Sequence, residues 1–368
     1  MNAAIPFNAL DRQHDDVLSA EIADAVNRVV RSGWYVLGEE VAAFEREFAA
    51  YCGVDHAIGV GNGSDALEIA ITALDLPPGA RIAVAPNASM YATLAIVANG
   101  CGPAFVDVDP ESATMDPAAL DDAIADGVDA IVVTHLYGRL AAIETIVARA
   151  DSRGIPVIED CAQAHGATRG GKRAGAFGSL ACFSFYPTKN LGALGDGGAV
   201  VARDATLAER VRRLRQYGWA TKYDIALAHG RNSRLDELQA AILRRKLPRL
   251  DAWNRRRREI ARRYREGISH AAIATPALRG DDDISHLYVV RSSARDRLRE
   301  HLAACGVRTD VHYPIPDHRQ RVFGGRFDAL KLPAAEALAA SALSLPCFPE
   351  LRDDEVDAVV DACNRWRP

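Results

Sequence analysis

The chain has 368 residues, of which 49% are hydrophobic and 25% charged, a composition typical of globular proteins. Its net charge of −5 gives no general attraction to nucleic acid or to an anionic membrane surface, so we expect neither as a partner. The seven cysteines form no C-x-x-C pair, and no basic segment with an apolar core opens the chain, so we expect a cytoplasmic protein with reduced thiols rather than a secreted or membrane-anchored one.

Short apolar runs that predict strands recur along the first two thirds of the chain. Stretches with apolar residues at three- and four-residue spacing separate the first five runs and predict helices. This alternation indicates an α/β protein with a mostly parallel sheet. A glycine-rich link over 192–198 joins the last two runs, which allows an antiparallel neighbour there. The predicted strands are 57–60, 81–85, 104–108, 130–134, 156–159, 181–185 and 199–202.

A glycine turn over 59–67 follows the first predicted strand and leads into a helix. Free N–H groups at a helix start bind phosphate, and glycines let the ligand approach closely. The turn is no dinucleotide fingerprint, because Ser64 stands where a third glycine is expected. A ligand with one phosphate fits better, although a plain turn with Ser64 or Asp65 capping the helix would have the same sequence. Ser184 and the loop around Asn232 are candidates for further donors.

Lys189 and Asp160 follow the ends of two predicted strands. Pyridoxal phosphate (PLP) enzymes need an amine that forms a Schiff base with the cofactor aldehyde, and a carboxylate that keeps the pyridine nitrogen protonated. Taken alone, Lys189 could be an ordinary surface lysine. Together with the glycine turn, the pair favours PLP as the cofactor.

Two other motifs share some features with nucleotide or metal sites. Residues 166–173 match a phosphate-binding loop up to Arg173, which replaces the serine or threonine that would bind magnesium. No H-E-x-x-H pair is present, and His312 and His318 lie in a proline-containing loop. We therefore expect no metal site and interpret these histidines as loop or substrate contacts.

The pattern of the chain changes near Pro248. A long Arg-rich helical stretch begins there, followed by predicted strands and a terminal helix. The chain is also long enough for two domains. We predict a three-layer large domain over 1–248, with a seven-stranded sheet, and a smaller C-terminal α+β domain over 249–368.

These motifs resemble the nucleotide-sugar aminotransferases of the aspartate-aminotransferase fold, which is fold type I of the PLP enzymes. Among them, the chain is most similar to the enzymes that aminate sugar 3-ketones. The resemblance runs in order over nearly the whole chain. It rests on segments 61–67, 159–166, 184–190, 195–198, 232–241 and 312–314.

The resemblance implies a role for each motif residue. Lys189 would form the Schiff base, Asp160 would pair with the pyridine nitrogen, and Gln163 would contact the phenolic oxygen of PLP. His165 matches the motif and is the third catalytic candidate. The phosphate would be bound by Gly63, Ser64 and Ser184, with Asn232 contributed by the partner subunit of a homodimer with shared active sites. Substrate contacts are expected from Trp34, Tyr35, Tyr186, His312, Tyr313 and His318.

One segment departs from the family pattern. The family usually has an aromatic residue where Met90 aligns, and this residue covers the cofactor ring. Either Met90 covers the ring through its thioether, or Tyr91 is shifted into place.

The resemblance also implies an activity, namely transfer of an amino group from glutamate to a ketosugar nucleotide. Relatives that dehydrate their substrate lack the lysine, so Lys189 favours transamination. The loop over 32–40 is similar to that of enzymes that aminate carbon 3 of dTDP-linked 6-deoxyhexoses. Amination at carbon 4 or carbon 2, a fold-type-I enzyme acting on amino acids through Arg234 or Arg308, and a catalytically silent sugar-nucleotide sensor stay open.

Overall fold

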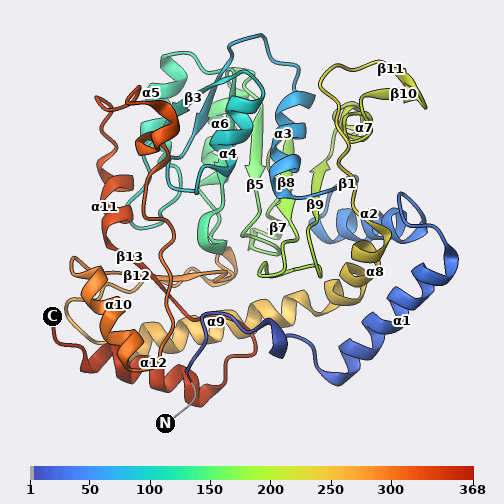
Figure 1. The fold of residues 1–368 in the computed structure, drawn as a ribbon. Helices are drawn as coiled ribbons and strands as arrows, with labels where there is room; N and C mark the ends of the chain where they lie inside the picture. The colour runs from blue at the N-terminus through green and yellow to red at the C-terminus, as the bar shows by residue number, and fades with distance from the viewer. Residues whose placement is uncertain (1–3) are drawn as a thin grey trace.

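A seven-stranded sheet forms the centre of the computed structural model, which describes residues 4–368 (Figure 1). The strand order is β1-β9-β8-β5-β4-β2-β3. β9 is antiparallel to both β1 and β8, and the other neighbours pair in parallel. The strands are β1 (His56–Val60), β2 (Arg81–Val84), β3 (Gly102–Phe105), β4 (Ala130–Thr134), β5 (Val157–Asp160), β8 (Leu180–Ser184) and β9 (Gly198–Ala202). All seven predicted strands and the antiparallel neighbour are confirmed.

Helices cover both faces of this sheet, because side chains along each strand alternate between two apolar clusters. On β4, Ala130 and Val132 contribute to one cluster, whereas Ile131 and Val133 contribute to the other. The first face is covered by α3 (Gly63–Ala73), α4 (Tyr91–Ala98) and α7 (Ala205–Leu214), and the second by α2 (Glu39–Cys52), α5 (Pro117–Ala125) and α6 (Ile143–Asp151). The predicted mixed α/β architecture with helices in two outer layers is confirmed.

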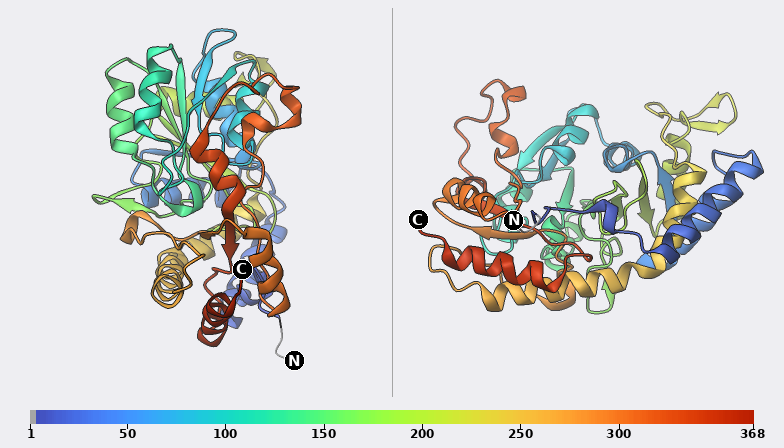
Figure 2. Two further views of the ribbon diagram at one scale, coloured as in Figure 1. Left: turned by 90° about the vertical axis from the view of Figure 1, so that its left-hand side faces the viewer. Right: turned by 60° about the horizontal axis from the view of Figure 1, so that its bottom comes forward.

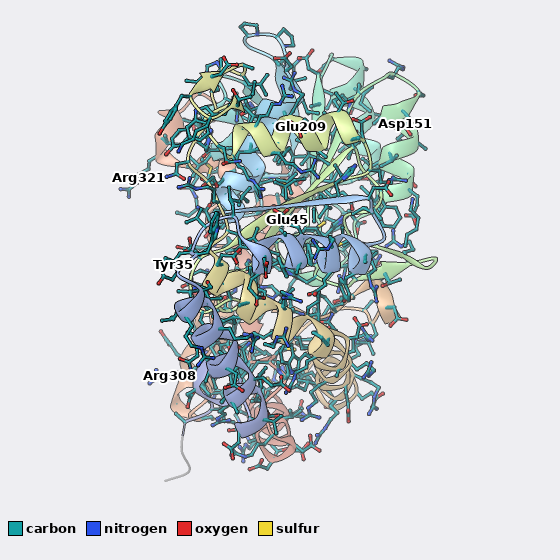
Figure 3. The ribbon with its side chains drawn as sticks, turned by 90° about the vertical axis from the view of Figure 1, so that its right-hand side faces the viewer. Tyr35, Glu45, Asp151, Glu209, Arg308 and Arg321 are labelled. Carbon is teal, nitrogen blue, oxygen red and sulfur yellow. The ribbon has the colours of Figure 1, made fainter. Side chains whose placement is uncertain are left out.

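Charged side chains fix α2 to the edge of the sheet. Glu45 of α2 points toward β1 (Figure 3), where its Oε1 accepts the Gly59 N–H at 2.8 Å. Arg215 pairs with Glu45 and donates to the Gly59 carbonyl at 2.8 Å. The edge strand that leads into the glycine turn is therefore held from two sides.

The C-terminal part of the chain builds a core of its own around a two-stranded antiparallel sheet of β12 (Tyr288–Arg291) and β13 (Ala342–Leu345). It packs against α9 (Leu250–Gly267), α10 (Arg295–Ala304) and α12 (Asp353–Arg365), and α12 lies beside α9 (Figure 2). Ile5 and Ala9 belong to this core, and Ile5 pairs with Val307. The N-terminal segment thus packs with the C-terminal core, and the predicted division at Pro248 stays a prediction.

The remaining elements connect these parts. They are α1 (Asp16–Ser32), α8 (Glu237–Lys246), α11 (Pro333–Ser341), the strand pairs β6 (Thr168–Arg169) with β7 (Lys172–Arg173) and β10 (Trp219–Thr221) with β11 (Asp224–Ile225), and the 3-10 turns η1 (Leu10–Arg12), η2 (Leu136–Gly138), η3 (Leu247–Arg249), η4 (Gly280–Asp282), η5 (Asp317–Arg319) and η6 (Arg321–Phe323). Within residues 4–368, no helix has the length and apolarity needed to span a bilayer.

Candidate active site

A cavity of about 540 Å³ lies at the carboxyl ends of the parallel strands, which is where ligands bind in open α/β sheets. The segments after β1, β2, β4, β5 and β8 all reach it. The C-terminal part closes it from the other side. It is lined by Phe7, Asn8, Asn62, Gly63, Ser64, Leu67, Ala88, Tyr91, Thr134, Leu136, Asp160, Ala162, Gln163, Ser184, Tyr186, Thr188, Lys189, Asp196, Arg257, His286, Leu287, Asp310, His312, Tyr313 and Cys347.

The glycine turn places the start of α3 on this cavity. The helix is capped by Asn62, whose Oδ1 accepts the Asp65 N–H at 2.8 Å, and not by Ser64 or Asp65, which the alternative interpretation of the turn named as caps. Asn62 does this because it is the last residue with extended backbone before the helix. A Cβ added to Gly63 would lie 2.6 Å from the Cβ of Ser184. Gly63 therefore allows the end of β8 to approach the start of α3, where an anion is stabilised by free N–H groups.

Asp160 and Lys189 both line the cavity, where Asp160 is buried and Lys189 is partly buried. Asp160 Oδ1 accepts the Ala162 N–H at 3.1 Å, and Thr134 Oγ1 donates to its Oδ2 at 3.3 Å. Burial lowers the pKa of Lys189 to about 8, against the opposing effect of the Asp160 charge. Burial also raises the pKa of Asp160, although the Ala162 hydrogen bond and the Lys189 charge oppose this rise. At pH 7, about a tenth of the lysine is therefore an unprotonated amine, which is the nucleophilic form.

Gln163 connects the sheet to the 310–319 loop. Its Oε1 accepts the Tyr137 N–H at 2.7 Å, and its Nε2 donates to the Tyr313 hydroxyl at 3.0 Å. Tyr137 in turn donates from its hydroxyl to the His312 carbonyl at 2.5 Å. These bonds fix His312 and Tyr313 in the cavity wall, together with Gln163 itself.

Of the two residues considered for covering the cofactor ring, Tyr91 lines the cavity and Met90 does not. Ser89 and Met90 both have positive φ, +63° and +69°, and α4 begins directly after them. This turn buries Met90, which is 8% exposed, and leaves Tyr91 53% exposed. We therefore assign no cofactor contact to Met90.

Several predicted site residues lie away from this cavity. His165 is fully buried against Phe183 and Phe185, and burial lowers its pKa to about 3, so it is a neutral core residue here. Its match to the family motif did not reveal which way the side chain points. His318 is also buried, with Nε2 3.0 Å from Glu336 Oε1. Neither side chain lines the cavity.

Trp34, Tyr35 and Asn232 lie elsewhere on the surface of this subunit. Trp34 lines an open groove between α1 and α2, and Tyr35 is half exposed at the edge of the molecule (Figure 3). Asn232 pairs with Gln216, while the adjacent Ser233 accepts the Gly61 N–H at 2.9 Å. The loop that carries Asn232 therefore touches the glycine turn, but the Asn232 side chain does not line the cavity.

Other cavity residues were not found from the sequence. His286 Nδ1 lies 2.8 Å from Asn190 Oδ1, and Arg257 donates to the His286 carbonyl at 3.2 Å. Phe7 stacks on His312 with ring centroids 5.6 Å apart. No local pattern marks these side chains, because only the packing of the C-terminal part and the N-terminal segment brings them here.

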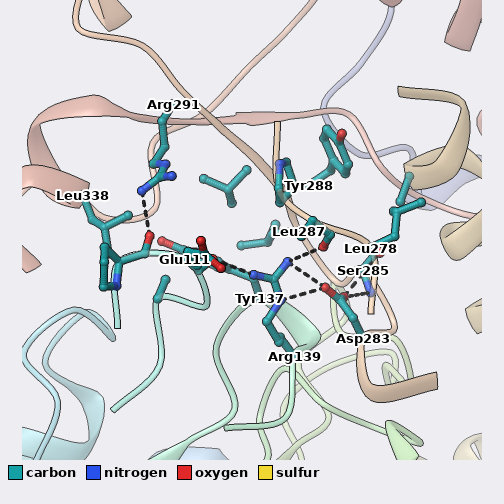
Figure 4. A pocket seen from close by; sticks show the side chains of 16 residues that line it. Glu111, Tyr137, Arg139, Leu278, Asp283, Ser285, Leu287, Tyr288, Arg291 and Leu338 are labelled. Atoms are coloured by element: carbon teal, nitrogen blue, oxygen red, sulfur yellow. Dashed lines mark hydrogen bonds and ion pairs between the residues drawn. The ribbon is translucent and has the colours of Figure 1, made fainter. Parts of the chain in front are cut away.

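A second cavity, of about 40 Å³, is shown in Figure 4. Its central residue is Arg139, which donates to Asp283 at 2.9 Å and to the Glu111 carbonyl at 3.0 Å. The space holds about one water molecule. We therefore interpret it as a joint between the sheet and the C-terminal part rather than a ligand site.

A buried cluster behind Asp160 has the residue types of a metal site. His135, Glu159 and Cys161 place their ligand atoms within 4.8 Å of one another. However, His135 Nδ1 accepts the Ala141 N–H at 3.1 Å, and its Nε2 donates to Glu159 at 2.9 Å. Glu159 also accepts the backbone N–H groups of 175, 177 and 178. These bonds occupy lone pairs that a metal would need. We therefore interpret the cluster as a hydrogen-bonded group that fixes β5 to the neighbouring segments.

The residues of the large cavity fit PLP. The cofactor needs an amine for its aldehyde, a carboxylate for its ring nitrogen and an anion site for its phosphate. Lys189, Asp160 and the N-terminus of α3 supply these groups in one cavity.

Comparisons with known proteins agree with this chemistry. A model of the DegT/DnrJ/EryC1/StrS aminotransferase family matches residues 16–364. The dTDP-3-amino-3,6-dideoxy-alpha-D-galactopyranose transaminase of Aneurinibacillus thermoaerophilus is 47% identical over 363 residues, 98% of this chain and 99% of the relative. The dTDP-3-amino-3,4,6-trideoxy-alpha-D-glucose transaminase of Streptomyces venezuelae is 44% identical over 365 residues, 98% of this chain and 96% of the relative. The crystal structure of S. venezuelae DesV in complex with a ketimine intermediate matches with a TM-score of 0.95 and 43% identity, covering 99% of each chain.

Proposed function

We propose, on the premise that this chain belongs to the DegT/DnrJ/EryC1/StrS aminotransferase family, that it transfers an amino group from glutamate to carbon 3 of a dTDP-linked 3-keto-6-deoxyhexose. The enzyme is a PLP-dependent aminotransferase of fold type I, as the sequence motifs predict. The observation that carries the proposal is the meeting of Lys189, Asp160 and the start of α3 in one cavity.

Each of these groups has a defined task in the proposed site. Gly63, Ser64 and Ser184 hold the cofactor phosphate, and Asp160 pairs with the ring nitrogen. Gln163 donates to the phenolic oxygen, a role supported by its Nε2, which lines the cavity wall and donates to the Tyr313 hydroxyl. Tyr91 takes the place above the ring. When bound, PLP supplies an aldehyde for the Schiff base and a sink for the electrons that are released by proton removal.

Lys189 is the proton carrier of the proposed reaction. Once its Nζ is free, it removes the proton from the α-carbon of glutamate, because its lowered pKa leaves a base near neutral pH. The negative charge of Asp160 opposes loss of the proton on the ring nitrogen. The hydrogen bonds from the Ala162 N–H and the Thr134 hydroxyl fix the orientation of this carboxylate. His312 and Tyr313, fixed in the cavity wall through Tyr137 and Gln163, are placed for substrate contacts.

We also propose that two subunits complete each active site. Trp34 and Tyr35 are 63% and 50% exposed, and Val36 of the same loop pairs with Asp236. This loop and the one that carries Asn232 thus form one exposed surface beside the glycine turn. Two-fold pairing through that surface would bring Asn232 of the partner subunit toward the phosphate. Mixing Lys189→Ala with Asn232→Ala subunits should then restore activity, because one hybrid site keeps both residues.

The assignment of carbon 3 as the position that receives the amino group is supported by both relatives, whose names specify 3-amino sugars. The test is incubation with glutamate and a panel of 3-keto and 4-keto sugar nucleotides, followed by location of the new amine by NMR. Amination of the 3-ketone is expected. Amination at carbon 4 alone would refute the regiochemistry. Binding without turnover of any ketosugar would favour a sensor. The cytoplasmic location stays a prediction.

A further inference from the structure

A carboxyl group outside the catalytic set joins two segments of the cavity wall. Asp317 is 1% exposed and belongs to the 310–319 loop, which also carries Tyr313. Its Oδ1 accepts the Met90 N–H at 3.0 Å, and its Oδ2 accepts the Thr93 hydroxyl at 2.6 Å. The Asp317 N–H donates to the Pro86 carbonyl at 2.6 Å. Both segments are thus fixed to each other through one residue.

We propose that Asp317 is a positioning residue that holds Tyr91 over the cofactor by fixing the Ser89–Met90 turn. This inference rests on the proposed function, because it assumes that PLP binds in the large cavity below Tyr91.

The turn needs an external partner. Ser89 and Met90 both adopt left-handed backbone conformations, which side chains with a Cβ rarely do in succession. Asp317 accepts the N–H of Met90, which precedes the first turn of α4, and the hydroxyl of Thr93 within that turn. Without Asp317, a buried N–H would lose its acceptor, and the turn could relax. Tyr91 would then leave its place in the wall.

Burial makes a charged carboxyl group at this position costly. Burial raises the pKa of Asp317 to about 7, which shows that its environment disfavours the charge. A carboxyl group that fixes a strained turn at the cavity wall in spite of this cost is expected to serve the site.

The same group also fixes the distance between two aromatic side chains. Tyr91 follows the turn that Asp317 holds, and Tyr313 lies on the loop to which Asp317 belongs, tied to Gln163 on the sheet. Both rings line the cavity. Asp317 therefore couples the segment that covers the cofactor to the segment expected to contact the substrate.

The experiment measures the dissociation constant of PLP for the full chain after removal of the cofactor, together with thermal unfolding of the cofactor-free protein. Asp317→Leu should weaken PLP binding about tenfold, the loss expected for one buried hydrogen-bonded group, and should also lower the melting temperature, because the buried Met90 N–H loses its acceptor. Asp317→Asn should stay within about twofold of the parent, since the amide can accept from Met90 and donate to Thr93.

A matched control is Asp107→Leu. Asp107 also caps a distant helix, accepting the N–H groups of Ala334 and Ala335 at 3.0 and 2.9 Å, but it does not line the cavity. This variant should lower the melting temperature and leave PLP binding unchanged. If Asp317→Leu does not fold, Thr93→Val removes the hydroxyl donor alone and should weaken PLP binding in the same direction.

A double-mutant cycle with Tyr91→Ala tests whether Asp317 acts through the ring. In a protein that already carries Tyr91→Ala, Asp317→Leu should cause little further loss of PLP affinity. The inference is overturned if Asp317→Leu binds PLP like the parent, or if its effect is undiminished without Tyr91. Neither result affects the proposed function, which fails instead if Lys189→Ala keeps the visible absorbance and turnover.

Discussion

Gly63→Ala tests the contact between the glycine turn and β8. The backbone of Gly63 is compatible with alanine, since its φ lies outside the left-handed region. The new methyl group, however, would lie 2.6 Å from the Cβ of Ser184, whereas ordinary contact begins at 3.4 Å. The start of α3 and the end of β8 must therefore separate by about 0.8 Å, and overpacking of this kind costs about 1–3 kcal/mol.

The same separation moves Ser184 away from the N–H groups of α3. We expect PLP to bind about 10- to 100-fold more weakly, since each 1.4 kcal/mol is a factor of ten. The assay is urea unfolding of the cofactor-free protein, combined with titration of PLP. Gly102→Ala is the control, because nothing lies within 4 Å of its added Cβ and its backbone is also compatible with alanine.

A second variant separates the steric effect from the loss of a donor. Ser184→Gly removes the Cβ that the alanine would touch, so Gly63→Ala with Ser184→Gly should recover most of the lost stability but little of the PLP affinity. If Gly63→Ala is as stable as the parent and binds PLP equally well, the close approach of the two segments is not what the structure indicates.

Three further predictions concern charged groups. Lys189→Ala should lose the visible absorbance of bound PLP and all turnover. In the parent protein, the rate of PLP attachment should rise with pH up to about 8 and then level off, because only the unprotonated amine attacks, and stopped-flow absorbance measures this rate. Asp160→Asn should reduce turnover by orders of magnitude while the urea midpoint shifts little, and an unchanged turnover number would remove Asp160 from its role. Lys246 is fully buried and donates to Gln13 at 2.9 Å, and burial lowers its pKa to about 8. Between pH 8 and about 10.5, the lysine is therefore protonated in the unfolded chain but mostly unprotonated in the native protein. Lys246 should therefore contribute about 3 kcal/mol less stability at pH 7 than above pH 10.5, and Lys246→Met should raise the stability at pH 7 relative to pH 10.5 by about this amount. Parallel pH profiles of the parent and the variant would contradict this prediction.

Local sequence patterns were sufficient for the sheet and for the groups that end its strands. Asp160 and Lys189 could be paired from the sequence alone, because each follows an apolar run of strand length and the carboxyl ends of parallel strands meet at one edge. The glycine turn could be interpreted for the same reason. The capping residue of α3 could not be predicted, since Asn62, Ser64 and Asp65 all have side chains that can cap a helix and only the backbone conformation selects Asn62.

Residues that reach the site through tertiary packing had no such signal. Asp317 and His286 come from loops of the C-terminal part, and their neighbours in sequence do not show which way they face. His165 shows the opposite error. Its motif places it close to the site in sequence, but the rings of Phe183 in β8 and of Phe185, directly after β8, pack against it. A motif therefore located the strand end correctly but did not determine the direction of each side chain.

The pairing of Ile5 with Val307 has a consequence for the order in which the chain is made. Phe7, two residues after Ile5, forms part of the cavity wall through its stacking on His312. A ribosome releases the N-terminal segment first, but its pairing partner Val307 and the stacking partner of Phe7, His312, emerge only near the end of synthesis. The sheet and its glycine turn can form earlier from nearby sequence. The part of the cavity wall that contains Phe7 is therefore completed only late in synthesis, after the glycine turn, Asp160 and Lys189 have been made.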